Sequence, residues 1–149
     1  MSQPIHILVV DDEPIIRKSI GLLLEHDGHS VWQADGGKAA LAEMAQRRFD
    51  LVITDFSMPG MQGDELVARI RQQLPDQPIL MITAFVEEFK VFGEAAGRVD
   101  AMILKPFSFK QLREAIEVAL TPRQPDQRGA LPPIIQAPPA PDRIPPLEP

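Results

Sequence analysis

The sequence contains no cysteine, so neither a disulfide framework nor a cysteine-based metal site can form. It also lacks any apolar run that approaches the roughly 20 residues needed by a membrane-spanning helix. The first residues do not show the basic stretch followed by an apolar stretch that marks a signal peptide. We therefore expect a cytoplasmic protein without a membrane span.

Basic residues are also fewer than acidic residues. The chain has 15 Lys and Arg against 21 Asp and Glu, which gives a net charge of -6 and a pI near 5.0. Such a chain lacks the basic footprint that supplies non-specific affinity for nucleic acid. We expect no direct nucleic-acid binding, and we expect a divalent cation or basic partners instead.

Proline is scarce in most of the chain and abundant at its end. Of 16 prolines, ten follow Thr121. Because proline lacks an N–H group and fixes its own φ angle, the end of the chain cannot form helices or inner strands. We predict a folded domain over residues 1–120, which is long enough to bury a core, and a proline-rich, disordered tail over 121–149.

Short apolar segments alternate with amphipathic segments through the folded part. This alternation predicts an α/β fold, with a doubly wound five-stranded parallel sheet and five covering helices. The expected strand order is 2-1-3-4-5, which makes the first and third strands neighbours. The strands are expected at about 5–10, 30–34, 49–54, 78–83 and 101–104, and the helices at about 14–26, 38–47, 62–74, 86–96 and 108–120.

Four of the predicted strands end in residues with useful chemistry. Binding sites in such sheets lie beyond the carboxyl ends of the strands. The residues at these ends are Asp11 and Asp12 after the first strand, Asp55 after the third, Thr83 after the fourth and Lys105 after the fifth. We expect them to converge on one edge of the sheet.

The expected cluster suits phosphoryl transfer. Three ionised carboxylates need a counter-charge, and Mg²⁺ supplies it because it prefers oxygen ligands and leaves room for a phosphate. One carboxylate, Asp55, is then free to attack phosphorus and form an acyl phosphate. Lys105 would offset the negative charge of the phosphoryl oxygens, and Thr83 would donate a hydrogen bond to one of them.

Each residue alone has a plainer interpretation. Acidic residues before Pro14 could cap a helix, and Asp55 could belong to a turn. Thr83 is an ordinary strand residue, and Lys105 an ordinary surface lysine. The combination of four separate strand ends favours a functional site.

These motifs together resemble the receiver domain of two-component response regulators. The resemblance runs from about Ile5 to Leu120, and its motifs are Asp11-Asp12, Asp55 with Met58-Pro59-Gly60 and Gly63, Thr83-Ala84, and Lys105-Pro106-Phe107. It implies a flavodoxin-like fold and Mg²⁺-dependent transfer of phosphate to Asp55 from a sensor histidine kinase or a phosphotransfer protein.

The resemblance also assigns roles to single residues. It implies Asp11, Asp12 and Asp55 as the metal carboxylates, with the backbone carbonyl of Ser57 as a further ligand. It implies that Thr83 and Lys105 contact the phosphoryl group. Receivers commonly carry Tyr or Phe three residues before the lysine, as part of a switch with the threonine, whereas this chain has Met102. Methionine could still repack there, but it has no ring and no hydroxyl.

The leading hypothesis is therefore a stand-alone phosphoacceptor signalling protein rather than an enzyme. It would contribute to its own phosphorylation and dephosphorylation, and it would signal by contact with a downstream protein, by passing the phosphate on, or as a phosphorylated dimer. One alternative is the receiver fragment of a larger response regulator or hybrid kinase whose effector domain is missing. Another is a phosphorylation-independent binding module with the same fold.

Overall fold

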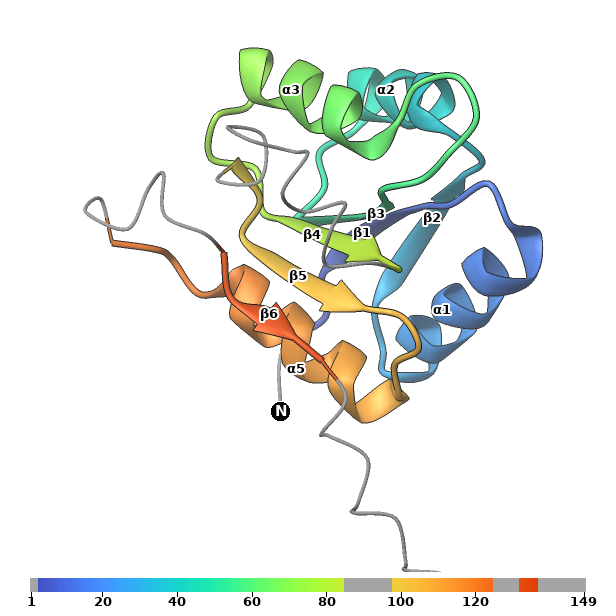
Figure 1. Ribbon diagram of the computed structural model, residues 1–149, viewed down its shortest axis with the longest axis vertical. Coiled ribbons are helices and arrows are strands. Elements are labelled where there is room, and N and C mark those ends of the chain that lie inside the picture. Colours follow the sequence, from blue (N-terminus) through green and yellow to red (C-terminus); the bar gives the residue numbers. More distant parts are fainter. Residues whose placement is uncertain (1–2, 85–97, 125–131, 137–149) are drawn as a thin grey trace, which may run out of the picture.

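The computed structural model describes residues 3–84, 98–124 and 132–136, and it shows a parallel sheet with helices on both faces (Figure 1). The helix predicted over 86–96 lies outside these residues. The strands are β1 (His6–Val10), β2 (Ser30–Ala34), β3 (Leu51–Asp55), β4 (Ile79–Thr83), β5 (Ala101–Leu104) and β6 (Ile134–Ile135). The described helices are α1 (Pro14–His26), α2 (Gly37–Gln46), α3 (Gly63–Gln73) and α5 (Phe109–Leu120).

The strand order is β2-β1-β3-β4-β5-β6, and all pairs are parallel. Its first five strands confirm the doubly wound order expected from the sequence. Strands are added to one side of β1 and then, from β3 onward, to its other side, so the strand order reverses between β1 and β3. Folds of this kind bind ligands at the carboxyl end of the sheet at that point. In the described part of the chain, no helix has the length and apolarity to cross a bilayer.

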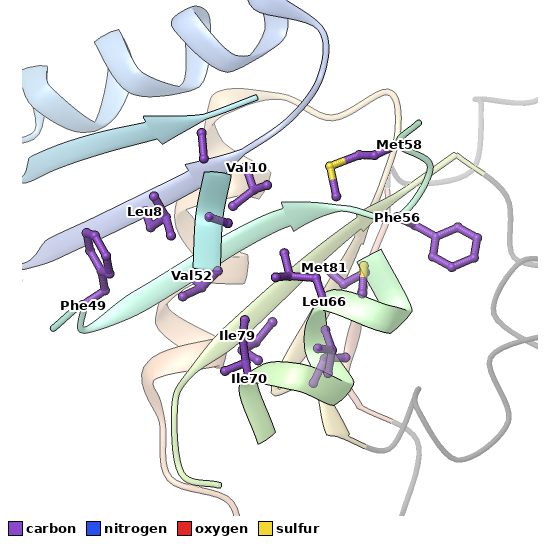
Figure 2. Close-up of a cluster of buried hydrophobic side chains, with 14 of the residues drawn as sticks. Leu8, Val10, Phe49, Val52, Phe56, Met58, Leu66, Ile70, Ile79 and Met81 are labelled. Carbon is purple, nitrogen blue, oxygen red and sulfur yellow. The ribbon is translucent and has the colours of Figure 1, made fainter. Parts of the chain in front are cut away.

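The two faces of the sheet have separate cores. Helices α1 and α5 cover one face, where Leu24 and Leu112 pack with inward residues of β1, β3, β4 and β5. Helices α2 and α3 cover the other face, and Figure 2 shows Leu66 and Ile70 of α3 against Val52 and Ile79. Every residue of β3 and β4 is buried because helices cover both faces of these strands.

Helix α5 begins with a capping interaction between Ser108 and Gln111. The Ser108 hydroxyl accepts a hydrogen bond from the Gln111 amide at 3.1 Å, and the Ser108 amide donates to the Gln111 side chain at 2.7 Å. This reciprocal pair is a capping box, which satisfies two amides that the first helical turn leaves unpaired. It fixes the point where the chain after Lys105 turns back over the sheet.

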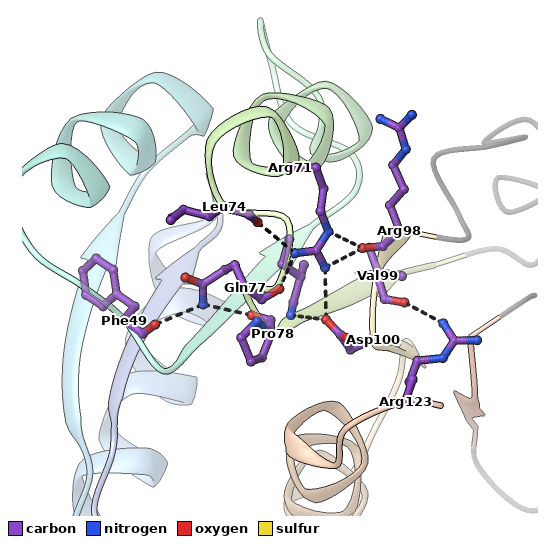
Figure 3. A network of polar contacts seen from close by, with 10 residues as sticks. Phe49, Arg71, Leu74, Gln77, Pro78, Arg98, Val99, Asp100 and Arg123 are labelled. Carbon is purple, nitrogen blue, oxygen red and sulfur yellow. Dashed lines mark hydrogen bonds and ion pairs between the residues drawn. The ribbon is translucent and has the colours of Figure 1, made fainter. Parts of the chain in front are cut away.

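A polar network closes the amino end of the sheet, far from the strand ends that carry the predicted site (Figure 3). The guanidinium of Arg71, at the end of α3, donates to the Arg98 carbonyl at 2.6 and 2.8 Å and to Asp100 at 3.1 Å. Asp100 also accepts from the Ile79 amide at 2.8 Å. Burial raises the pKa of Asp100, and Arg71 opposes this rise. The network anchors α3 to the starts of β4 and β5.

The sheet has one more strand than the five predicted. The sixth, β6, comes from the proline-rich segment and pairs with β5 in the register Met102↔Ile134 and Ile103↔Ile135. The Met102 amide donates to the Pro133 carbonyl at 2.9 Å. A proline has no N–H to donate, but its carbonyl still accepts, so a short edge strand can start at a proline. The proline content therefore excluded inner strands but not an edge strand.

Candidate functional site

Three carboxylates meet at the carboxyl end of the sheet. Asp11 and Asp12 follow β1, and Asp55 is the last residue of β3, the neighbouring strand. One ligand oxygen from each of the three lies within 4.8 Å of the other two. Asp11 and Asp55 are buried, and Asp12 is half-buried. The predicted convergence of these three side chains is therefore present in the fold.

Asp11 has one satisfied oxygen and one unsatisfied oxygen. Its Oδ1 accepts a hydrogen bond from the Glu13 amide at 2.9 Å, whereas its Oδ2 is buried and has no partner among the described residues. Burial is the main cause that raises the pKa of Asp11, and the Glu13 hydrogen bond opposes it. A buried carboxylate oxygen without a donor is costly, and a hard cation in the cluster would remove that cost. The oxygen-only donor set therefore fits Mg²⁺.

Asp55 lies beside Lys105, the basic residue that the sequence predicts at this edge of the sheet. The Lys105 ammonium is 3.4 Å from Asp55 Oδ1. The pKa of Asp55 is raised to about 6, mainly by burial and also by the neighbouring Asp11 and Asp12, while Lys105 acts in the opposite direction. The chain thus holds a carboxylate whose ionised form is under-stabilised and which gains from additional positive charge.

The turn after β3 is held tightly against the sheet. The Phe56 amide donates to the Ile82 carbonyl at 2.9 Å, and the Gly63 amide donates to the Phe56 carbonyl at 2.8 Å. A Cβ on Gly63 would lie 2.5 Å from the Asp55 carbonyl oxygen, so only glycine allows α3 to begin this close to the site. Ser57 lies in this turn and is exposed.

Thr83 is the last residue of β4, and Lys105 directly follows β5, the neighbouring strand. Thr83 is fully buried, pairs in register with Leu104, and accepts the Lys105 amide on its carbonyl at 2.8 Å. It lies one residue beyond Ile82, which pairs with Asp55. The Thr83 hydroxyl and the Lys105 ammonium are therefore at the same edge of the sheet as Asp55. The peptide bond between Lys105 and Pro106 is cis.

Met102, the residue in the place of the usual aromatic ring, is fully buried in the described structure, with 1% of its surface exposed. It pairs in register with Met81 and belongs to the core cluster on the α2 and α3 face. Its backbone amide is the one that donates to Pro133. Met102 therefore connects β5, the strand that precedes Lys105, to both the core and β6.

Sequence reasoning did not anticipate the support for Asp11 by Arg17. The guanidinium of Arg17 donates to the Asp11 carbonyl at 2.7 Å and to the Gln33 side chain at 3.3 Å. Arg17 lies one turn into α1, and nothing in its sequence position distinguishes it from an ordinary surface arginine. Its function in fixing the β1 turn becomes visible only when β2 is placed beside β1.

Comparison with known proteins gives one family. Residues 7–117 match the family model for the response regulator receiver domain. Chemotaxis protein CheY-3 of Vibrio cholerae is 36% identical over 120 residues, which cover 78% of this chain and 92% of that protein. The probable transcriptional regulatory protein TcrX of Mycobacterium tuberculosis is 33% identical over 111 residues, which cover 74% of this chain. The chain spans about half, 47%, of the length of TcrX.

A solved structure shows the same fold. The response regulator TrrA of Thermotoga maritima, in complex with Mg²⁺ and BeF, superposes with a TM-score of 0.71 and 34% identity. The match covers 77% of this chain and 98% of that one.

Proposed function

The chain belongs to the response regulator receiver domain family, and from this membership we propose that Asp55 is its phosphoacceptor. The observation that carries the proposal is the position of Asp55, buried at the end of β3 within 4.8 Å of two further carboxylate ligands and 3.4 Å from Lys105. The residues proposed as nucleophile, as cation ligands and as the charge-offsetting ammonium thus lie close to one another.

The proposed reaction transfers one phosphoryl group. An oxygen of ionised Asp55 attacks phosphorus, a P–O bond to the carboxylate forms, and the bond from phosphorus to the donor breaks. With a phosphohistidine donor, the imidazole leaves with the bonding electron pair and takes a proton. The product on this chain is an acyl phosphate, which water hydrolyses to restore Asp55.

Each neighbour has a separate proposed role. Asp11, Asp12, Asp55 and the Ser57 carbonyl would hold Mg²⁺, which when bound offsets the negative charge on the transferred oxygens. Lys105 would leave the Asp55 oxygen and contact the phosphoryl group. Thr83 would donate its hydroxyl to a phosphoryl oxygen, which makes the end of β4 sensitive to phosphorylation.

We propose that the response passes from Thr83 to Met102. The Lys105 amide is bonded to the Thr83 carbonyl, and β4 and β5 are paired from Leu80↔Ala101 to Thr83↔Leu104. A displacement of Thr83 toward a phosphoryl group therefore acts on β5. Met102 would adjust by repacking its flexible side chain, where an aromatic residue would rotate. Histidine kinases or phosphotransfer proteins are the proposed donors, and a downstream protein is the proposed target.

Acetyl phosphate with Mg²⁺ tests the proposal without a kinase. Intact-mass spectrometry should show one added phosphoryl group on the wild type and none on Asp55→Asn. A wild type that stays unmodified, both here and with a cognate kinase, contradicts the proposal and favours the phosphorylation-independent binding module.

A receiver within a longer protein is the second candidate. The observation that favours it is the match to TcrX, of which the aligned region covers only 47%. An effector domain would then supply the output. The molecular mass of the native protein in cell extracts, detected with an antibody to the described domain, separates this candidate from a chain of 149 residues.

A further inference from the structure

The outer edge of β5 carries neither a charged residue nor a proline, two features that commonly protect an edge strand. Its residues, Ala101–Leu104, are apolar and uncharged, and three of the four are buried. An uncovered strand of this kind presents free backbone groups to any other strand. In the structure, β6 covers this edge and accepts the Met102 amide on Pro133.

Strand β6 makes few contacts with the rest of the fold. Strand β6 has two residues, and the Ile134 side chain remains exposed, with 38% of its surface accessible. Ile135 is half-buried and packs on the core of the α1 and α5 face, and Pro132 is buried. Strands this short bury little apolar area, so they open at low cost compared with the central strands.

The hand of the connection also sets β6 apart. Strand β2 lies on one side of β1, and β6 lies on the opposite side of β5, yet α1 and α5 cover the same face of the sheet. The two crossovers through these helices therefore have opposite hands. The β1-α1-β2 crossover is right-handed (Figure 1), so the β5-α5-β6 crossover is left-handed, a rare arrangement in parallel sheets. The fold does not require β6 for its topology.

A contact before β6 keeps the segment near its edge. The Arg123 guanidinium donates to the Val99 carbonyl at 3.3 Å, just before β5 begins (Figure 3). The chain is thus fixed at the start of β5 before it reaches Pro132. A segment tethered this close has a high effective concentration at the edge and can outcompete a strand from another molecule.

We propose that the β5 edge is a strand-docking surface whose resting occupant is this chain's own segment Pro132–Gln136, and that this detachable cover prevents pairing with a second copy of the chain. The proposal does not depend on phosphorylation of Asp55. It gives the proline-rich segment a defined role in controlling self-association through β5.

Two proline substitutions in the full chain test the proposal, because the backbone amides that they remove point in opposite directions. The Met102 amide points toward β6, so the alternation of a parallel ladder directs the Ile135 amide to the Met102 carbonyl and the Ile134 amide away from β5. Ile135→Pro therefore breaks the ladder, and Ile134→Pro is the matched control that leaves it intact.

The measurements are exchange of the Met102 amide by NMR and molecular mass by light scattering. We expect Ile135→Pro to exchange Met102 about tenfold faster or more than the wild type, and to form dimers at concentrations where the wild type and Ile134→Pro are monomers. Amides of β3 should stay protected in all three proteins.

Four results would overturn the proposal. The first is equal protection of Met102 in both variants. The second is an Ile135→Pro variant that frees Met102 but remains monomeric at all concentrations. The third is loss of protection throughout β3, which would make β6 an essential part of the fold. The fourth is a dimeric wild type that Ile135→Pro dissociates, since the segment would then dock on the second copy.

Discussion

At the scale of single residues, the site is a balance between burial and charge around Asp55. Lys105, at 3.4 Å, does not compensate fully for the loss of water, and the pKa of Asp55 rises to about 6. Burial likewise leaves Asp11 Oδ2 without a partner in the part of the chain that the structure describes. The cluster is therefore arranged for a ligand of positive charge, at a cost to the stability of the metal-free fold.

The first prediction concerns that cost. The pKa of Asp55 is raised in the folded chain, so the folded state binds its proton more tightly than the unfolded state does, and stability falls as pH rises from about 4 to above 6. Asp55→Asn removes this ionisation. In EDTA, we expect its stability gain over the wild type to be on the order of 2 kcal/mol larger at pH 7 than at pH 4.

Urea unfolding at the two pH values measures the difference. Asp35→Asn, at an exposed carboxylate outside the cluster, is the control and should show no such pH-dependent gain. An Asp55→Asn gain of equal size at pH 4 and pH 7 would contradict the assigned cause.

The second prediction concerns the metal. A ligand that binds only the folded state raises the free energy of unfolding as its concentration rises. Mg²⁺ should therefore stabilise the wild type, and EDTA should reverse the effect. Asp11→Asn should lose most of this stabilisation, while Asp35→Asn keeps it, as followed by thermal unfolding over a Mg²⁺ titration. Undiminished stabilisation of Asp11→Asn would exclude Asp11 as a ligand.

At the scale of elements, the site depends on how closely α3 approaches the end of β3. The sequence contained the relevant glycine within a motif, but its physical role is visible only in space. A Cβ on Gly63 would lie 2.5 Å from the Asp55 carbonyl oxygen and 2.9 Å from the Phe56 Cα, and both of these are backbone atoms. Backbone cannot yield as the end of a flexible side chain can.

The third prediction follows from that contact. Gly63→Ala should reduce stability by about 2 kcal/mol or more and should slow phosphorylation, because α3 must move away from the site. Gly36→Ala is the control, since a Cβ there meets nothing within 4 Å. Chemical unfolding and acetyl phosphate labelling measure the two effects. A Gly63→Ala variant as stable and as reactive as Gly36→Ala would show that α3 can shift freely.

The elements were largely predictable from the sequence. Apolar β-branched runs located the first five strands, because this signal is local. Strand β6 was not predicted, since its pairing depends on the edge of β5 rather than on its own two residues. The Arg71–Asp100 network was not predicted either, because its partners are 29 residues apart and carry no motif.

At the scale of the whole molecule, the proposed signal from phosphorylated Asp55 would cross from β4 to β5. The order of the strands places Thr83 between Asp55 and Lys105, with Met102 three residues earlier on β5. This order could be inferred from the sequence. The buried position of Met102 and its bond to Pro133 could not, because both depend on how the core and the proline-rich segment pack.

The fourth prediction tests this path. Beryllofluoride with Mg²⁺ should shift the amide resonances of Asp55 and Met102 in the wild type. Thr83→Ala should retain the shift at Asp55 and lose most of that at Met102, because the hydroxyl that reports the phosphoryl group is gone. Thr83→Ser keeps the hydroxyl and should behave as the wild type. An undiminished Met102 shift in Thr83→Ala would place the coupling elsewhere.

The most direct test of the central claim is to locate the phosphoryl group. After incubation with acetyl phosphate and Mg²⁺, borohydride reduces an aspartyl phosphate to homoserine, which peptide mass spectrometry assigns to one position. We predict homoserine at position 55 alone, dependent on Mg²⁺ and absent from Asp55→Asn. Homoserine at position 11 or 12, or none at any position in a wild type that binds Mg²⁺, would contradict the assignment of Asp55 as the phosphoacceptor.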